Sequence, residues 1–150
     1  MARLVADAGL TSAIELDSAG TGAWHVGCPP DERAAAAAAA RGIAMRGVAR
    51  QVRPEDFEQF DLLLAMDAEN HRNLRALAPH AEARAKVRLL REFDPTTASG
   101  GAADHAVSLD VPDPYYGGTD GFAHVLDLIE AACAGLLDEL RDGTASAASS

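Results

Sequence analysis

The chain has 150 residues, of which 48% are hydrophobic, so it is long enough for one domain with a buried core and gives no sign of a second. Its formal net charge is -10 and Lys86 is its only lysine. This composition argues against a protein that binds nucleic acid or anionic membranes, because phosphate groups select for clustered positive charge.

The remaining global features concern the cellular compartment and the chain ends. The two cysteines, Cys28 and Cys133, make neither a disulfide framework nor a metal cluster, which fits a reducing cytoplasm. The sequence has no charged and apolar leader and no apolar run long enough to span a bilayer, so we expect a soluble, cytoplasmic protein. Residues 142–150 are small and polar, which predicts a disordered tail after a domain that covers residues 1–141.

Apolar periodicity in the first third of the chain predicts helix and strand in alternation, as is typical of α/β layer folds. Residues 1–8 have the pattern of a helix, although no capping residue precedes it. Residues 13–18 alternate as a strand and run into a loop at residues 19–22. Two prolines and two acidic residues then open an alanine-rich helix over residues 29–41, with Gly42 directly after it.

The rest of the chain continues the alternation. Residues 61–66 are continuously apolar, which is typical of a strand with helices on both faces. Asp67 is placed to cap the helix that follows. The predicted elements in order are a short helix at 54–60, a strand at 61–66, a helix up to residue 77, a strand at 86–90, a loop at 93–118 and a final helix at 120–140 with one apolar face.

The segment around Asp113 carries the clearest chemical signal. Asp113 stands between Pro112 and Pro114 and is followed by Tyr115 and Tyr116. Prolines on both sides disfavour a helix and hold this carboxyl group in an extended or turn conformation. With the aromatic rings that follow, such a loop presents a rigid acid beside a flat, apolar wall for a substrate. An ordinary Asp-Pro turn with two exposed tyrosines is the alternative.

Three separate segments are expected to meet at one edge of the sheet. In open α/β sheets ligands bind outside the carboxyl ends of the strands. The loop at residues 18–24, the turn at residues 66–67 and the loop with Asp113 would all emerge there. This convergence predicts the place of a site but not its reaction.

Metal chemistry has little support in the sequence. Four histidines lack a spacing shared with carboxylates or thiols, so no metal site is predicted: His71, His80, His105 and His124. His25 lies beside Trp24 and could touch a substrate, but an exposed loop histidine is the commoner case.

Several stretches together resemble one known family, the low-molecular-weight protein tyrosine phosphatases. In order they are residues 17–27 (DSAGTGAWHVG), 29–31, 48–51, 56–57, 60–61, 65–67 and 113–117 (DPYYG). The resemblance covers nearly the whole chain before the tail. It implies a three-layer, Rossmann-like or flavodoxin-like fold around a four-stranded parallel sheet.

The resemblance also implies an activity and its residues. The reaction would be hydrolysis of phosphotyrosine in proteins through a cysteinyl-phosphate, with no metal or organic cofactor. Asp113 would be the general acid that protonates the tyrosyl oxygen and then helps water to attack the phosphoenzyme. Trp24, Tyr115 and Tyr116 would line the slot for the aromatic ring, and Ser18 would support the phosphate-binding loop.

The nucleophile of that family is the cysteine of a Cys-x5-Arg loop, which this sequence does not contain. The sixth residue after Cys28 is Ala34, and the sixth after Cys133 is Glu139. Such a loop uses backbone N–H groups and arginine to bind phosphate and to lower the cysteine pKa. We therefore expect an N-terminally truncated member of the family that lacks the first, interior strand and this loop and that is inactive as a phosphatase.

Three alternatives stay open. The true start codon could lie upstream of Met1 and supply the strand and loop. The chain could be a pseudophosphatase that binds partners through its aromatic rim without catalysis. Arsenate reduction is a third alternative, although the absence of a cysteine near the anion site argues against it.

Overall fold

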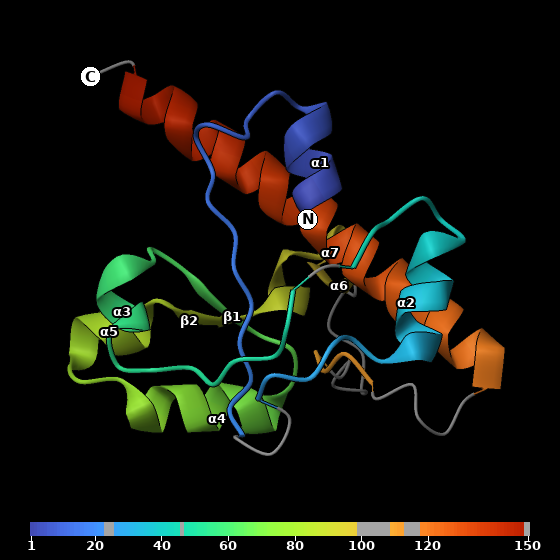
Figure 1. Cartoon of the computed structure of the whole chain (residues 1–150). Helices are drawn as coiled ribbons and strands as arrows, with labels where there is room; N and C mark the ends of the chain where they lie inside the picture. The colour runs from blue at the N-terminus through green and yellow to red at the C-terminus, as the bar shows by residue number, and fades with distance from the viewer. Residues whose placement is uncertain (23–25, 46, 99–108, 113–117, 149–150) are drawn as a thin grey trace.

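The structure, a computed structural model of the chain, describes residues 1–22, 26–45, 47–98, 109–112 and 118–148 (Figure 1). In chain order the elements are α1 (Ala2–Asp7), α2 (Glu32–Ala39), α3 (Asp56–Gln59), β1 (Leu63–Ala65), α4 (Ala68–Leu77), α5 (Ala81–Ala85), β2 (Val87–Leu89), the 3-10 helix η1 (Leu90–Phe93), α6 (Pro95–Ala98) and α7 (Gly118–Ala148).

The sheet in the described residues is formed by β1 and β2, which are parallel, with Leu63 opposite Val87 and Ala65 opposite Leu89. Parallel neighbours need a crossover connection, and here the chain crosses over through α4 and α5. The α/β parallel-sheet fold predicted from the sequence is thereby confirmed, as are strands within residues 61–66 and 86–90.

Helices cover both faces of this sheet (Figure 1). On one face Ala65 and Val87 belong to a core that also contains Phe57 of α3, Leu74 of α4, Ala83 of α5 and Ala78, which directly follows α4. On the other face Leu62 and Leu64 pack against a second core, made by η1 and α7 with Leu90, Phe93, Ala132, Cys133 and Leu136. Alternate side chains of a strand point to opposite faces, so the apolar side chains of residues 61–66 pack into both cores.

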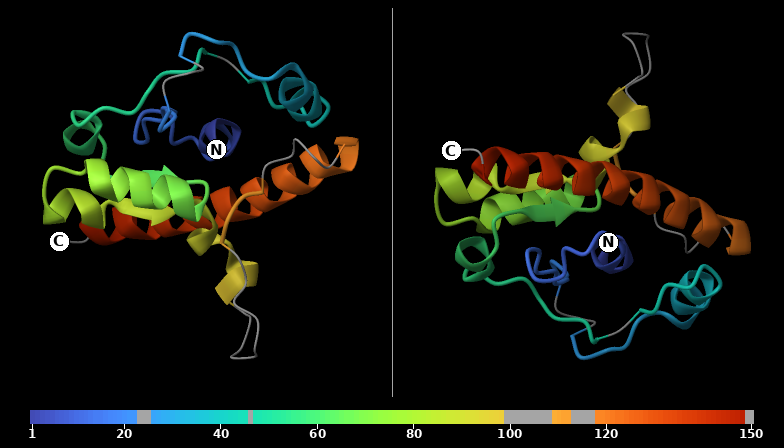
Figure 2. Two further views of the ribbon diagram at one scale, coloured as in Figure 1. Left: turned by 90° about the horizontal axis from the view of Figure 1, so that it is seen from below. Right: turned by 90° about the horizontal axis from the view of Figure 1, so that it is seen from above.

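The long helix α7 runs the length of the molecule (Figure 2). Arg41, just after α2, ties the two helices together, with Nη1 2.8 Å from the Oδ1 of Asp127. Residues 142–148, which belong to the segment predicted to be a disordered tail, continue α7 as far as Ala148. Alanine favours the helix, and adding turns to a helix that is already packed costs little. Among the described residues, no helix combines the length and apolarity that crossing a bilayer requires.

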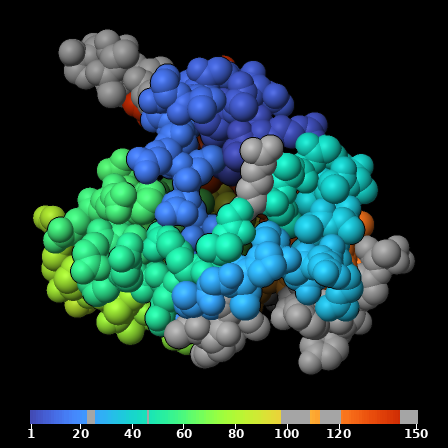
Figure 3. All heavy atoms as spheres, in the orientation of Figure 1, coloured from blue at the N-terminus to red at the C-terminus, as the bar shows by residue number. Residues whose placement is uncertain are grey.

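The predicted strand at residues 13–18 is absent from the structure. Only Gly20 forms a bridge, an isolated parallel one to Gln51. Leu16 is 44% exposed, and residues 11–22 cross the surface of the molecule in Figure 3. An alternating pattern makes a strand only where a neighbouring backbone offers partners along its length, and the described chain offers such partners only at Gly20.

The sequence pattern also missed the short helices α5, η1 and α6. The last of these lies at the start of the segment predicted to be a loop. A single turn has too few residues to show a helical period. The histidine at residue 80 caps α5, where its Nδ1 accepts a hydrogen bond from the N–H of Ala83 at 3.2 Å.

Candidate functional site

The turn after β1 is built as predicted. Asp67 follows the strand in extended conformation, and its Oδ1 accepts a hydrogen bond from the N–H of Asn70 at 2.7 Å. This capping bond satisfies a donor that the first turn of α4 leaves without a partner. The carboxyl end of β1 therefore leads straight into a fixed helix start.

The segment that precedes Asp113 in the chain lies on this turn. The N–H of Val111 donates to the carbonyl oxygen of Met66 at 2.7 Å, and the N–H of Ala68 donates to Oδ1 of Asp110 at 2.8 Å. Arg91 Nη1 in turn donates to the carbonyl oxygen of Asp110 at 3.1 Å. Residues 109–112 are thus anchored at the start of α4.

The loop that begins at Ser18 reaches the same helix start. The hydroxyl of Thr21 donates to Oδ1 of Asn70 at 3.0 Å. The three predicted segments therefore converge on the N-terminal turn of α4 in those of their residues that the structure describes. We call this meeting place the rim.

Residues 49–52, which we call the stem segment, form backbone hydrogen bonds with the loop that begins at Ser18. The N–H of Gly20 donates to the carbonyl oxygen of Arg50 at 2.8 Å, and the carbonyl of Gly20 accepts from the N–H of Val52 at 2.9 Å. Further along the chain, the N–H of Gly27 donates to the carbonyl oxygen of Ala49 at 2.7 Å. The chain thus leaves the stem segment near Gly20 and returns to it near Gly27.

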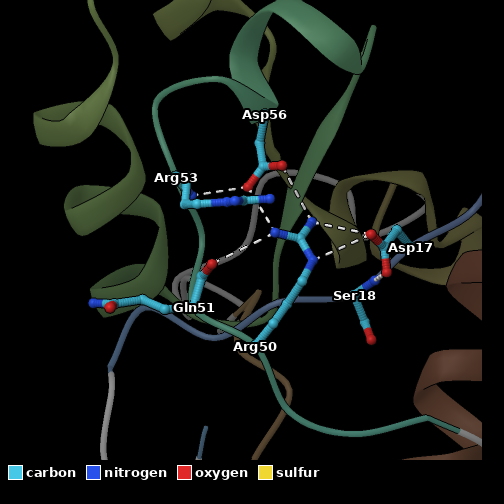
Figure 4. A network of polar contacts seen from close by, with 6 residues as sticks. All are labelled: Asp17, Ser18, Arg50, Gln51, Arg53 and Asp56. Atoms are coloured by element: carbon cyan, nitrogen blue, oxygen red, sulfur yellow. Dashed lines mark hydrogen bonds and ion pairs between the residues drawn. The ribbon is translucent and has the colours of Figure 1, made fainter. Parts of the chain in front are cut away.

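A network of polar contacts lies beside the stem segment (Figure 4). The guanidinium of Arg50 donates to both carboxylate oxygens of Asp56, from Nη1 at 2.9 Å and from Nη2 at 3.2 Å. Its Nε donates to Oδ2 of Asp17 at 3.2 Å. The backbone N–H of Arg53 also donates to Asp56, at 2.8 Å. One arginine therefore joins two carboxylates from different parts of the chain.

The charges of this network are stabilised by their surroundings. Burial of Asp56, which is 3% exposed, opposes its ionisation, but hydrogen bonds from Arg50 and from the N–H of Arg53 outweigh that effect and hold the pKa of Asp56 below its usual range. The hydrogen bond to Asp56, reinforced by Asp17 and only partly opposed by desolvation, raises the pKa of Arg50. Both partners stay charged at neutral pH.

Of the predicted site residues, the structure describes Ser18. It is exposed, and its N–H donates to Oδ1 of Asp17 at 2.8 Å. Its hydroxyl has no hydrogen-bond partner within the described parts of the chain, so its support of a phosphate loop stays a prediction. The others lie outside the described residues: Trp24, Asp113, Tyr115 and Tyr116.

Sequence reasoning did not single out Arg50, Asp56 or Asn70. The first two occur in stretches that resemble the phosphatase family, and this was the signal available. Arg50 and Asp56 are six positions apart, but Asp17 lies 33 positions before Arg50. No local pattern predicts a pair over that separation.

Neither cysteine lies in an arrangement that would serve as a nucleophile site among the described residues. Both are free thiols; Cys28 is exposed, and Cys133 is buried on α7, as predicted from its apolar face. Cys133 borders a cavity of about 670 Å³ between α1, residues 42–44 and α7, which shares no lining residue with the rim. No group of three His, Cys, Asp or Glu residues that could hold a metal ion occurs in the described ranges.

Comparison with known proteins identifies the family. The model of the family described as low molecular weight phosphotyrosine protein phosphatase matches residues 1–146. The chain belongs to this family.

Individual relatives agree with this assignment. A low molecular weight protein-tyrosine-phosphatase of Streptomyces coelicolor is 49% identical over 138 residues, which are 92% of this chain and 80% of the relative. The crystal structure of a protein tyrosine phosphatase from Entamoeba histolytica superimposes with a TM-score of 0.82 at 32% identity and covers 95% of this chain and 85% of its own. YfkJ of Bacillus subtilis gives 0.78 at 36% identity over 94% of this chain and 82% of its own. The family resemblance found in the sequence is confirmed.

Proposed function

We propose that this protein acts in the hydrolysis of phosphotyrosine in proteins, with Asp113 as general acid and an aromatic slot made by Trp24, Tyr115 and Tyr116. The observation that carries the proposal is the anchoring of the segment before Asp113, in which Val111 N–H donates to the carbonyl oxygen of Met66 at 2.7 Å. Because of this contact, the segment that leads into Asp113 begins at a fixed point at the carboxyl end of β1. In α/β folds, ligands bind near the carboxyl ends of the strands.

The roles follow from the chemistry of a phosphate ester. Tyrosine is a poor leaving group until its oxygen is protonated, which a positioned carboxylic acid can do. The resulting carboxylate can then accept a proton from the water that attacks the phosphoenzyme. Trp24, Tyr115 and Tyr116 would bind the phenyl ring by stacked or edge-to-face contact, and Ser18 would support the phosphate-binding loop through its hydroxyl.

The covalent step needs a nucleophile that these 150 residues do not supply, since neither cysteine is followed six positions later by arginine. We therefore expect the 150-residue polypeptide by itself to hydrolyse no aryl phosphate, because the thiolate and its anion cradle provide most of the rate enhancement. Purified protein would be assayed with p-nitrophenyl phosphate, with and without Asp113→Asn. Turnover that the substitution abolishes would reveal a nucleophile elsewhere in the chain.

The general-acid role can be tested in a variant of the protein that is extended at its N-terminus by about 20 residues, which form a strand and a Cys-x5-Arg loop. In that protein Asp113→Asn should lower kcat by about 100- to 10,000-fold. The loss should be larger with phenyl phosphate than with p-nitrophenyl phosphate, because the poorer leaving group depends more on protonation. Asp61→Asn, at an exposed position, is the matched control. An active extended protein that tolerates Asp113→Asn would remove Asp113 from this role.

A binding function without catalysis is the second candidate. It requires the polypeptide to bind a phosphotyrosine peptide more tightly than the same peptide with tyrosine. We expect no such preference, because the backbone anion cradle belongs to the Cys-x5-Arg loop. Calorimetric titration with the two peptides separates the candidates.

A further inference from the structure

The loop that carries Trp24 is held at both of its ends by the stem segment. At one end the N–H of Gly20 donates to the carbonyl oxygen of Arg50 at 2.8 Å. At the other end the N–H of Gly27 donates to the carbonyl oxygen of Ala49 at 2.7 Å, and the N–H of Ala49 donates to the carbonyl oxygen of Cys28 at 2.9 Å. Any shift of the stem segment therefore moves both ends of this loop.

The side chain of Arg50 ties the stem segment to a fixed point. Its bidentate partner, Asp56, has a side chain that is 5% exposed and that also accepts from the N–H of Arg53 at 2.8 Å. Asp56 is the first residue of α3, next to Phe57 in the core. The guanidinium is thus anchored on the packed part of the molecule.

The same guanidinium holds the chain where it enters the loop. Oδ2 of Asp17 lies 3.1 Å from Nη2 of Arg50, while its Oδ1 accepts the N–H of Ser18 at 2.8 Å. Figure 4 shows Asp56 above the guanidinium and Asp17 to its right, with both carboxylates turned toward it. A lysine ammonium could not reproduce this arrangement, because it lacks the planar fork that binds one carboxylate with two nitrogens and reaches a second.

From these contacts we infer that Arg50 is a positioning residue: by linking Asp17 to the buried Asp56 it fixes the two described ends, at Gly20 and Gly27, of the loop that carries Trp24. The inference rests on the proposed function for the role of Trp24 at the substrate slot. Its structural content, the position of the loop, can be measured without substrate or turnover. Its failure is therefore distinct from a failure of the general-acid assignment, which Asp113→Asn tests separately.

Trp24 is the only tryptophan of the chain, so its fluorescence reports directly on this loop. The emission maximum and acrylamide quenching would be measured for the full chain and for Arg50→Lys, Asp17→Asn and the double variant. Arg84→Lys is the matched control, since Arg84 is an exposed residue on α5. Far-UV circular dichroism at the same temperature verifies that each variant is folded.

We expect Arg50→Lys and Asp17→Asn each to change the emission maximum and the acrylamide quenching of Trp24, with circular dichroism unchanged. The double variant should shift no further than Arg50→Lys alone, because both substitutions remove one interaction. Unchanged emission in both single variants, or an equal shift in Arg84→Lys, overturns the inference. If Arg50→Lys does not fold, Asp17→Asn decides alone, since its carboxylate is 49% exposed and contributes little to global stability.

Discussion

The two cores around the sheet and the loops of the rim differ in what holds them. In the cores Phe57 is 1% exposed and Ala83 is fully buried, whereas Val26 and Val48, which neighbour the hydrogen-bonded residues Gly27 and Ala49, are 53% and 64% exposed. The rim is held by backbone hydrogen bonds and by the charges around Arg50 instead. Apolar burial, which contributes most to folding, is concentrated in the cores, whereas the predicted site residues belong to the loops.

The largest expected difference between the regions comes from apolar truncation. Phe57→Ala should destabilise the protein by about 3–5 kcal/mol, because it empties a fully buried site between α3 and the sheet. Leu16→Ala, at a residue that is 44% exposed, should change stability by less than about 0.5 kcal/mol. Urea unfolding of both variants measures the two values. Equal losses would show that residues 11–22 contribute to the core after all.

An effect of intermediate size on stability is expected at the ion pair between Arg50 of the stem segment and Asp56 of α3. Asp56→Asn leaves Arg50 without its buried partner and should cost about 3 kcal/mol at pH 7, the low end for a broken buried ion pair because Arg50 is partly exposed. Asp61→Asn, at an exposed position, is the control.

The pH dependence of this effect has a definite sign. The pKa of Asp56 is lowered on folding, so its contribution is complete above the unfolded pKa of about 4 and is lost as the pH falls through the lower folded value. The gap in stability between the native chain and Asp56→Asn should therefore narrow in acid. A gap that widens below pH 4 would contradict the assigned direction.

The last comparison concerns two glycines of α7, one in contact with η1 and one without a neighbour among the described residues. A Cβ on Gly135 would overlap the carbonyl oxygen of Phe93, so Gly135→Ala should cost about 1–3 kcal/mol through displacement of η1 from α7. On the same helix, a Cβ added to Gly143 would meet nothing within 4 Å. Gly143→Ala should stabilise by up to about 1 kcal/mol, because alanine loses less backbone entropy in a helix. Thermal melts that rank the two substitutions the other way would place the close contact elsewhere.

Most secondary structure could be predicted because its signals are local. Asp31 and Asp67 each cap the helix that directly follows them in the sequence, α2 and α4. The Oδ1 of Asp31, for example, accepts a hydrogen bond from the N–H of Arg33 at 2.9 Å. The apolar run that contains β1 needs helices on both faces, whichever helices they are. The family could be recognised for a different reason, since its stretches keep their order and spacing along the chain.

The strand expected at residues 13–18 and the network around Arg50 depended on tertiary structure. Leu16 has the alternation of a strand, but whether a backbone lies alongside it is not encoded within those six residues. Asp17 and Arg50 are 33 positions apart and meet only because the stem segment pairs with Gly20. A cap or an amphipathic period acts within one or two turns of its own chain, whereas a strand partner or an ion pair is supplied by a distant segment that only the folded chain brings near.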